Sequence, residues 1–341
     1  MIEKYYSGVI EQIYNRIGKE TRNIVMANYS NDFSIENLEV IRRYQSNEDN
    51  VFFAYSEFSY NTLVGAYEPF LDIICNMHRR FIGGSFDDFQ KECGVYYLHR
   101  QVLNSYYETG ECFREETVLL NEVAYEQRRM TMAIADMLKK LSEVKPLMIV
   151  INRFQMASKS SIETIKYLID NPCANIGIVL GVNAIVKGTD STVEVWDRIV
   201  ESLEDRSAIY YIGSAGPLKN NIKTTNDDEL YITMNFEQSI QEASNIMEFL
   251  DYEQARRGCR IIEHKIKFEN AWIDEKSLRR FYLVYARTSV LLGEMSKAIE
   301  LMNEYKALIP ENDSEHYFSL YYFMKGTCYM TEGKLEKAEG C

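Results

Sequence analysis

Up to about residue 215, short apolar runs alternate with longer segments of helical periodicity. Apolar runs that are separated by helices need crossover connections, so this pattern predicts a parallel sheet covered by helices on both faces. The expected strands are residues 23–27, 50–58, 147–151, 175–183 and 208–213. The expected helices are an amphipathic stretch over residues 1–20, then residues 34–44, 66–82, 115–144, 160–170 and 191–205. We therefore predict a three-layer α/β domain over residues 1–215.

The pattern changes after this domain. Residues 216–230 are polar, begin with Gly216-Pro217 and are predicted to form a linker. Residues 231–341 have helical periodicity throughout and contain an internal repeat of about 40 residues. The repeated strings are DYEQARRG (251–258), GEMSKAIE (293–300) and GKLEKAEG (333–340), which align on Ala255, Ala298 and Ala338. Small residues at these positions let paired helices pack closely, so we predict an all-α solenoid.

The repeated unit resembles a tetratricopeptide repeat in a longer variety. The residues that carry the resemblance are Gly293, Ala298, Tyr305, Ala307 and Leu308, with Pro310 as the terminator one residue early. A generic array of helical hairpins remains the alternative. Because the sequence stops at Cys341, inside the second helix of a repeat, we expect it to be the N-terminal part of a longer protein.

Charge and cysteine content limit the classes of function. With 51 acidic and 38 basic side chains the formal net charge is −13, which disfavours direct nucleic-acid binding by this segment. No apolar run approaches the roughly 20 residues of a membrane span, and no signal peptide is present. The seven cysteines are odd in number and spread along the chain, which favours free thiols and no metal site. We expect a soluble, cytoplasmic protein without membrane association.

The loop after the first strand lacks the chemistry of a phosphate-binding loop. Such a loop reads G-x-x-x-x-G-K-[ST], in which backbone N–H groups and the Lys hold phosphates and the hydroxyl binds magnesium. The corresponding octet is ANYSNDFS (27–34), where Ala27 and Asp32 replace the glycines and Phe33 replaces the Lys. Ser34 alone fits.

The later strand and helix show a matching loss. The string INRFQMASKSSIETIKYL (151–168) resembles the acidic strand-to-helix segment of the STAND family, AAA-related signalling ATPases that include LuxR-type regulators with C-terminal repeat arrays. Asn152, Arg153 and Ser158 occupy its three acidic positions. Residues 53–74 resemble the second strand and following helix of the family, and Asn183 occupies the position of its sensor residue.

The resemblance implies a P-loop-NTPase-like fold without hydrolysis. Losing the Lys, both glycines and all three acids removes phosphate binding and magnesium coordination together. We expect no catalytic residue, metal or cofactor, with Ser34, Asn31, Asn152 and Asn183 as vestigial nucleotide contacts; residual binding of ATP or ADP stays a lesser alternative. Asn152-Arg153 is predicted to belong to a signalling surface.

Together these features predict a bacterial-type regulatory protein. A degenerate ATPase domain and tetratricopeptide-like repeats would bind a small-molecule ligand or a protein or peptide partner, and would control an output domain beyond this chain. The resemblance implies either a helix-turn-helix regulator or a GGDEF diguanylate cyclase as that output. Self-association through the repeats is a further expectation. The alternatives are an NTPase with a non-standard phosphate loop and a pure interaction scaffold.

Overall fold

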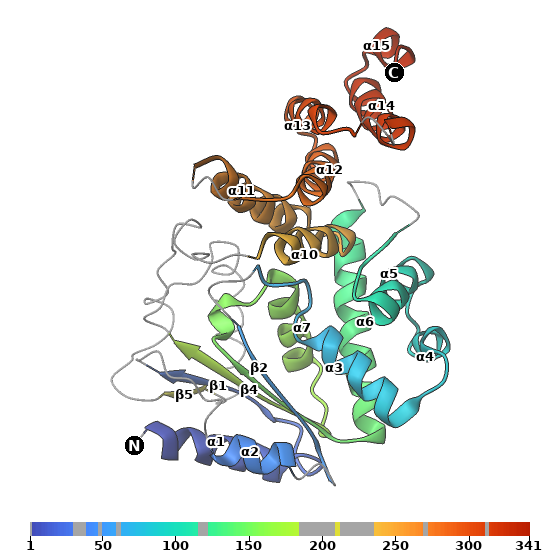
Figure 1. The fold of residues 1–341 in the computed structure, drawn as a ribbon. Coiled ribbons are helices and arrows are strands. Elements are labelled where there is room, and N and C mark those ends of the chain that lie inside the picture. Colours follow the sequence, from blue (N-terminus) through green and yellow to red (C-terminus); the bar gives the residue numbers. More distant parts are fainter. Residues whose placement is uncertain are drawn as a thin grey trace.

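The first part of the chain forms a five-stranded parallel sheet. The computed structural model describes residues 2–29, 39–46, 50–58, 63–114, 122–183, 209–211, 235–268, 272–310 and 314–341. The strands are β1 (Ile24–Tyr29), β2 (Phe52–Glu57), β3 (Leu147–Asn152), β4 (Ile176–Asn183) and β5 (Ile209–Tyr211). They lie in the order β2-β3-β4-β1-β5, and each neighbouring pair is parallel (Figure 1). The predicted parallel sheet is therefore confirmed.

Helices cover both faces of this sheet, as the continuous apolar runs predict. Helices α1 (Ile2–Arg16) and α2 (Glu39–Ser46) lie on one face, and α3 (Phe70–Met77), α6 (Val123–Val144) and α7 (Lys159–Asp170) lie on the other (Figure 1). All six residues of β3 are buried because it lies between two strands and two helical layers. Glycine at position 177 of β4 lets the side chains of Ile13 and Ile17 approach the sheet closely.

Several helix predictions need correction. The predicted helix over 66–82 begins only at Phe70, after Tyr67 with φ 58° and the N-cap Pro69, and it ends as the π-helix His78–Ile82. Two helices that the periodicity did not predict, α4 (Phe86–Glu92) and α5 (Tyr97–Thr109), follow it. Residues 115–121 of the predicted helix 115–144, the predicted helix 191–205 and the predicted linker 216–230 lie outside the described residues.

The second part of the chain is helical wherever it is described, as predicted. Its helices form three consecutive hairpins: α10 (Phe236–Glu248) with α11 (Tyr252–Phe268), α12 (Glu275–Leu291) with α13 (Met295–Ala307), and α14 (Ser314–Thr331) with α15 (Leu335–Glu339). The aligned Ala255 and Ala298 are fully buried, whereas Ala338 is partly exposed. Gly293 and Gly333, with φ of 78° and 74°, make the turns inside the last two hairpins.

The first hairpin packs against the α/β part, and we call this contact the junction. The side-chain amide of Asn245 in α10 accepts from the backbone N–H of Cys112 at 2.9 Å and donates to the carbonyl of Gly110 at 3.2 Å. Arg114 donates to the carbonyl of Glu248 at 3.1 Å. The carboxylate of Glu248 in turn pairs with Arg287 of α12 at 2.5 Å. Polar contacts thus run from the α/β part through α10 into the second hairpin, and α10 lies between these two parts of the chain (Figure 1).

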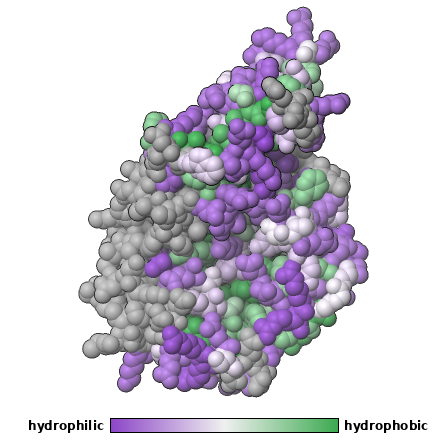
Figure 2. Space-filling view, in the orientation of Figure 1, coloured by the Kyte–Doolittle hydropathy of each residue, from purple (hydrophilic) through white to green (hydrophobic). Residues whose placement is uncertain are grey.

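The surface and the cysteines agree with the composition. Figure 2 shows a face on which hydrophilic residues predominate, with hydrophobic residues in small separate groups. Among the described helices, none combines the length and the apolar character that a membrane crossing requires. All seven cysteines are free thiols, as predicted.

Candidate functional site

Two of the predicted nucleotide contacts, Asn152 and Asn183, lie at the carboxyl edge of the sheet. In parallel α/β sheets, ligands bind outside the carboxyl ends of adjacent strands whose connections run in opposite directions. Strands β1 and β4 are such neighbours. The strand that follows β1 in the chain, β2, lies toward one end of the sheet, and the strand that follows β4, β5, lies toward the opposite end. Ser34 and Asn31 lie outside the described residues. Asn183 ends β4, but its side chain is also outside the described part, which leaves Asn152 at the end of β3.

Asn152 is a buried neutral group. Its side chain has no exposed area, and its Oδ1 lies 2.9 Å from the position that a Cβ on Gly181 would take. The hydroxyl of Tyr6, from α1, lies 2.1 Å from the same position. The absence of a side chain at Gly181 thus lets the phenol and the amide occupy this space. The prediction that Asn152 forms part of a signalling surface is wrong, because this residue lies inside the protein.

Arg153, the next residue, neutralises a carboxylate that sequence reasoning missed. Its guanidinium lies 3.3 Å from the carboxylate of Glu57, and both side chains are largely buried. The hydroxyl of Tyr55 donates to the same carboxylate at 2.6 Å. Glu57 is level with Asn152 because β2 and β3 pair in that register. An acid at the end of the predicted strand 50–58 was the available signal.

In the described part of the chain, the carboxyl edge of the sheet has few side chains that could bind a divalent cation. Asn152 has no charge, and the one carboxylate beside it is paired with Arg153. Among the described residues, no group of three or more His, Cys, Asp or Glu side chains is placed to hold a metal ion. Binding of Mg²⁺ in nucleotide sites depends on carboxylates together with substrate phosphates.

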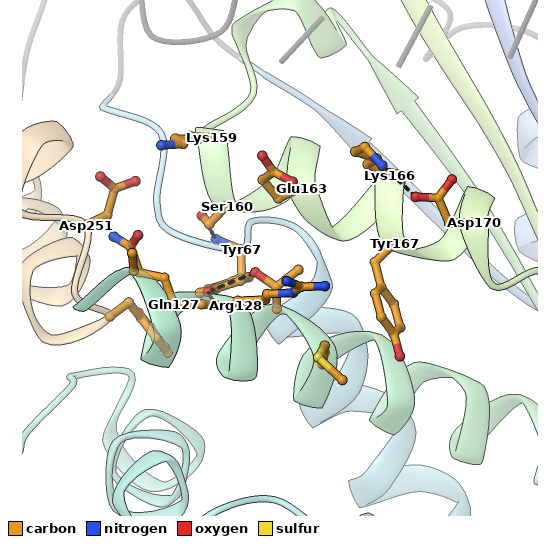
Figure 3. Close-up of a pocket in the computed structure, with 14 residues that line it drawn as sticks. Tyr67, Gln127, Arg128, Lys159, Ser160, Glu163, Lys166, Tyr167, Asp170 and Asp251 are labelled. Carbon is orange, nitrogen blue, oxygen red and sulfur yellow. Dashed lines mark hydrogen bonds and ion pairs between the residues drawn. The ribbon is translucent and has the colours of Figure 1, made fainter. Parts of the chain in front are cut away.

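A cavity of about 440 Å³ lies elsewhere, at the junction. Figure 3 shows α7 along one side, α6 along the other, and Asp251 approaching from the start of α11. Its volume is within the range of small-molecule sites, roughly 300–1,000 Å³. The residues that line it are Tyr67, Ala124, Gln127, Arg128, Thr131, Met132, Lys159, Ser160, Glu163, Lys166, Tyr167, Asp170, Phe249 and Asp251.

Helical spacing brings these side chains together. The lining residues of α6 recur at intervals of three and four, which places them on one face of the helix, and those of α7 follow the same rule. Tyr67 contacts both helices. Its backbone N–H donates to the Ser160 hydroxyl at 2.9 Å, and its own hydroxyl lies 3.3 Å from the carbonyl of Gln127. Burial raises the pKa of Tyr67 far above its ordinary value, so it stays a neutral wall.

The helical part supplies the remaining wall. The ring of Phe249 meets that of Tyr67 edge-on, with centroids 5.5 Å apart. The Gln127 amide donates to the carbonyl of Leu250 at 2.7 Å. Asp251 caps the start of α11 by accepting from the N–H of Gln254 at 3.3 Å, and burial raises its pKa. A molecule in this cavity would therefore contact both parts of the chain.

Among the described residues, three charged side chains at the cavity have no hydrogen-bond or ion-pair partner, although the charge of Lys159 acts on the carboxylate of Asp251. Lys166 and Asp170 form an ion pair with each other at 2.5 Å. In contrast, Arg128, Lys159 and Glu163 make no hydrogen bond or ion pair within the described part of the chain. Sequence reasoning missed all three, because they lie on two helices and no motif joins them.

A smaller cavity of about 210 Å³ shares Phe249 with the first and is acidic. Glu68 and Asp72 line it from the α/β part, and Glu242 lines it from α10. Tyr106 donates to Asp72 at 2.9 Å, and the N–H of Gly65 donates to Glu68 at 2.9 Å. Burial, together with the charges of Glu68 and Asp72, raises the pKa of Glu242 to about 7.

Comparison with known proteins gives no family model that matches the chain and no matching curated sequence. The chemistry of the two cavities and of the sheet edge is therefore the basis on which we infer a function.

Proposed function

We propose that this chain is a regulatory protein, in which a catalytically degenerate ATPase-like domain and tetratricopeptide-like repeats bind a ligand or a protein partner and control an output domain. The ligand occupies the junction cavity. The repeats carry the resulting change to the partner or output. The chain itself does not hydrolyse nucleotide.

The single observation that carries this proposal is the position of the 440 Å³ cavity between the two parts of the chain. Its walls come from α6 and α7 on one side and from the α10–α11 turn on the other. A ligand that contacts both walls favours the arrangement in which they are close, and it can shift an equilibrium only through such differential contacts. The Glu248–Arg287 ion pair gives that shift a route into the second hairpin.

The residues at the end of β3 support the absence of hydrolysis. A phosphoryl-transfer site needs metal ions and cations to neutralise the charge that develops on the phosphates. Asn152 is neutral and buried, and Arg153 is already paired with Glu57. The sequence of the phosphate-loop octet, with Asp32 and Phe33 where a glycine and a lysine are needed, points the same way.

A thermal-shift screen tests the ligand-binding part of this proposal. Nucleotides, sugars, amino acids and short peptides are added to the wild type and to two variants of α6. Ala124→Trp fills the rim of the cavity from an exposed position, while Lys140→Trp places the same bulk on an exposed position away from it. Binding to the folded state raises the melting temperature.

We expect at least one compound to stabilise the wild type and Lys140→Trp but not Ala124→Trp. If no compound stabilises the wild type, the pure scaffold is the better description. Equal stabilisation of Ala124→Trp would place the ligand outside the junction cavity.

A further inference from the structure

We propose that the junction cavity binds a small zwitterion that carries one ammonium group and two anionic groups, the chemistry of an acidic amino acid. This inference rests on the proposed function, because it names the ligand class of the same cavity. It is carried by the three charged side chains of the cavity that have no hydrogen-bond or ion-pair partner among the described residues.

The charges of the cavity do not all remain available to a ligand. Six of its lining residues are ionisable acids or bases: Arg128, Lys159, Lys166, Glu163, Asp170 and Asp251. Lys166 and Asp170 form an ion pair with each other, with 2.5 Å between Nζ and Oδ2. Asp251 is buried, accepts a hydrogen bond from the N–H of Gln254 at 3.3 Å, and is close enough for the charge of Lys159 to act on it.

The remaining set consists of two cations and one carboxylate. Arg128 and Lys159 are exposed, and Glu163 is half-buried; all three line the cavity. Paired charges inside a partly enclosed site gain strength from the lower dielectric, whereas a like charge brought beside Glu163 is disfavoured. The complementary ligand has two anionic groups for the cations and one ammonium group for Glu163.

The positions of the three groups suit this assignment. Lys159 is the first residue of α7, where the helix dipole also favours an anion. Glu163 lies one turn further along the same helix, so it faces the same space. Arg128 lies across the cavity on α6, and its planar guanidinium is suited to bidentate binding of a carboxylate (Figure 3).

The neutral walls suit a ligand with a short apolar stem. Tyr67, Phe249 and Met132 supply aromatic and thioether surface against which methylene groups can pack. A nucleoside triphosphate is a poor match, because it has several negative charges, no ammonium group, and would approach Glu163, Asp170 and Asp251. A sugar would leave all three charged groups without a partner.

Isothermal titration calorimetry with matched probes tests the inference. L-glutamate and L-aspartate carry all three charges, glutarate lacks the ammonium group, and γ-aminobutyrate lacks one carboxylate. We expect binding of at least one of the two acidic amino acids. We expect glutarate and γ-aminobutyrate to bind at least about tenfold more weakly, because each lost charge-assisted hydrogen bond contributes on the order of a factor of ten or more.

Variants separate the roles of the three groups. Arg128→Ala and Lys159→Ala should each weaken binding of the acidic amino acid by about tenfold or more, whereas Lys140→Ala, an exposed change on α6 away from the cavity, should leave it unchanged. Glu163→Gln should weaken binding of the acidic amino acid and strengthen binding of glutarate. This reversal of preference is a result that loss of folding cannot produce.

Two outcomes would overturn the inference, and they differ in what they say about the proposed function. If another class of compound stabilises the protein and Ala124→Trp abolishes that effect, the ligand class is wrong and the regulatory cavity stands. ATP as the tight ligand would be one such result. If no compound stabilises the wild type, both the ligand class and the ligand-binding function fail.

Discussion

The side-chain amide of Gln127 donates a 2.7 Å hydrogen bond to the backbone carbonyl of Leu250. Gln127 belongs to α6 of the α/β part, and Leu250 lies in the turn between α10 and α11. Leu250 has φ of 69°, a conformation that non-glycine residues adopt only where surrounding contacts hold them. This bond therefore links the two parts of the chain at the wall of the larger cavity.

Gln127→Ala should weaken the junction. The change removes the donor and leaves the Leu250 carbonyl without this partner in a partly buried place, which costs about 1 kcal/mol. We expect that decrease in the free energy of unfolding, measured by urea denaturation. Gln45→Ala, on the exposed side of α2, should change it by much less. Equal effects of the two changes would show that the bond does not stabilise the junction.

Gly181→Ala should destabilise the protein through Tyr6. A Cβ at this position would lie 2.1 Å from the Tyr6 hydroxyl and 2.9 Å from Oδ1 of Asn152, so we expect a loss of about 1–3 kcal/mol. Adding Tyr6→Phe should recover part of that loss, because it removes the atom in closest contact. A double-mutant cycle measures the interaction energy.

A matched glycine provides the control for this cycle. Gly8 lies in α1, and a Cβ there meets nothing within 4 Å. Gly8→Ala should therefore stabilise the protein by roughly 0.5–1 kcal/mol, the usual gain of alanine over glycine inside a helix. Simple additivity of Gly181→Ala and Tyr6→Phe would contradict the packing described at the end of β4.

Asn152→Asp restores an acid at the end of β3 but should destabilise the fold. The side chain is fully buried, so burial raises the pKa of the new carboxyl in the folded state above its unfolded value. Stability should then fall as pH rises through the interval between the two values, and the loss should be larger at pH 8 than at pH 4. Asn235→Asp is the control, because Asn235 is an exposed helix cap and Asp caps equally well. A neutral effect of Asn152→Asp at pH 8 would mean that the site tolerates a carboxylate.

Glu242 should make the junction sensitive to pH near neutrality. Its pKa is raised to about 7 by burial and by the charges of Glu68 and Asp72, while the unfolded value stays near 4.5. In the folded state the Glu242 carboxyl therefore stays protonated to a higher pH than in the unfolded state. The free energy of unfolding falls as pH rises from about 4.5 to 7. Among the described residues that line the smaller cavity, the other polar side chains are these two acids, Tyr106, Gln238 and Asn245, and none is a cation.

Glu242→Gln removes that dependence. We expect a higher melting temperature than the wild type at pH 8 and a much smaller difference at pH 5, measured by differential scanning fluorimetry across the pH range. Glu237→Gln, the same substitution at an exposed position of the same helix, should shift neither value appreciably. A pH profile of Glu242→Gln that parallels the wild type would contradict the raised pKa.

The layout of the fold was predictable because it depends on local patterns. Five apolar runs predicted the five strands, and the repeated alanines predicted the hairpins α10–α11 and α12–α13. The start of α3 was wrong, because Tyr67 and Pro69 set it through backbone conformation and not through periodicity. Helices α4 and α5 were missed; His78 packs edge-on against Phe86 of α4, a tertiary contact that no local period signals.

The site was far less predictable. The sequence showed that residues 152 and 153 have no carboxylate to coordinate a metal. It did not show that Asn152 is buried beside Gly181 or that Arg153 pairs with Glu57. Those relationships depend on strand order and register, which bring Arg153 beside Glu57, about a hundred positions earlier in the chain, and Asn152 beside Gly181 of the neighbouring strand. The junction cavity combines α6, α7 and the α10–α11 turn, so only the tertiary structure reveals it.

Phosphate release from millimolar ATP in the presence of Mg²⁺ tests most directly the proposal that this chain regulates without hydrolysing nucleotide. We predict that the wild type releases phosphate no faster than a Ser34→Ala variant, because the phosphate-loop octet lacks its Lys and both glycines and the end of β3 has Asn152 and Arg153 where acids are needed. Turnover by the wild type that Ser34→Ala abolishes would contradict the claim and identify the chain as an NTPase.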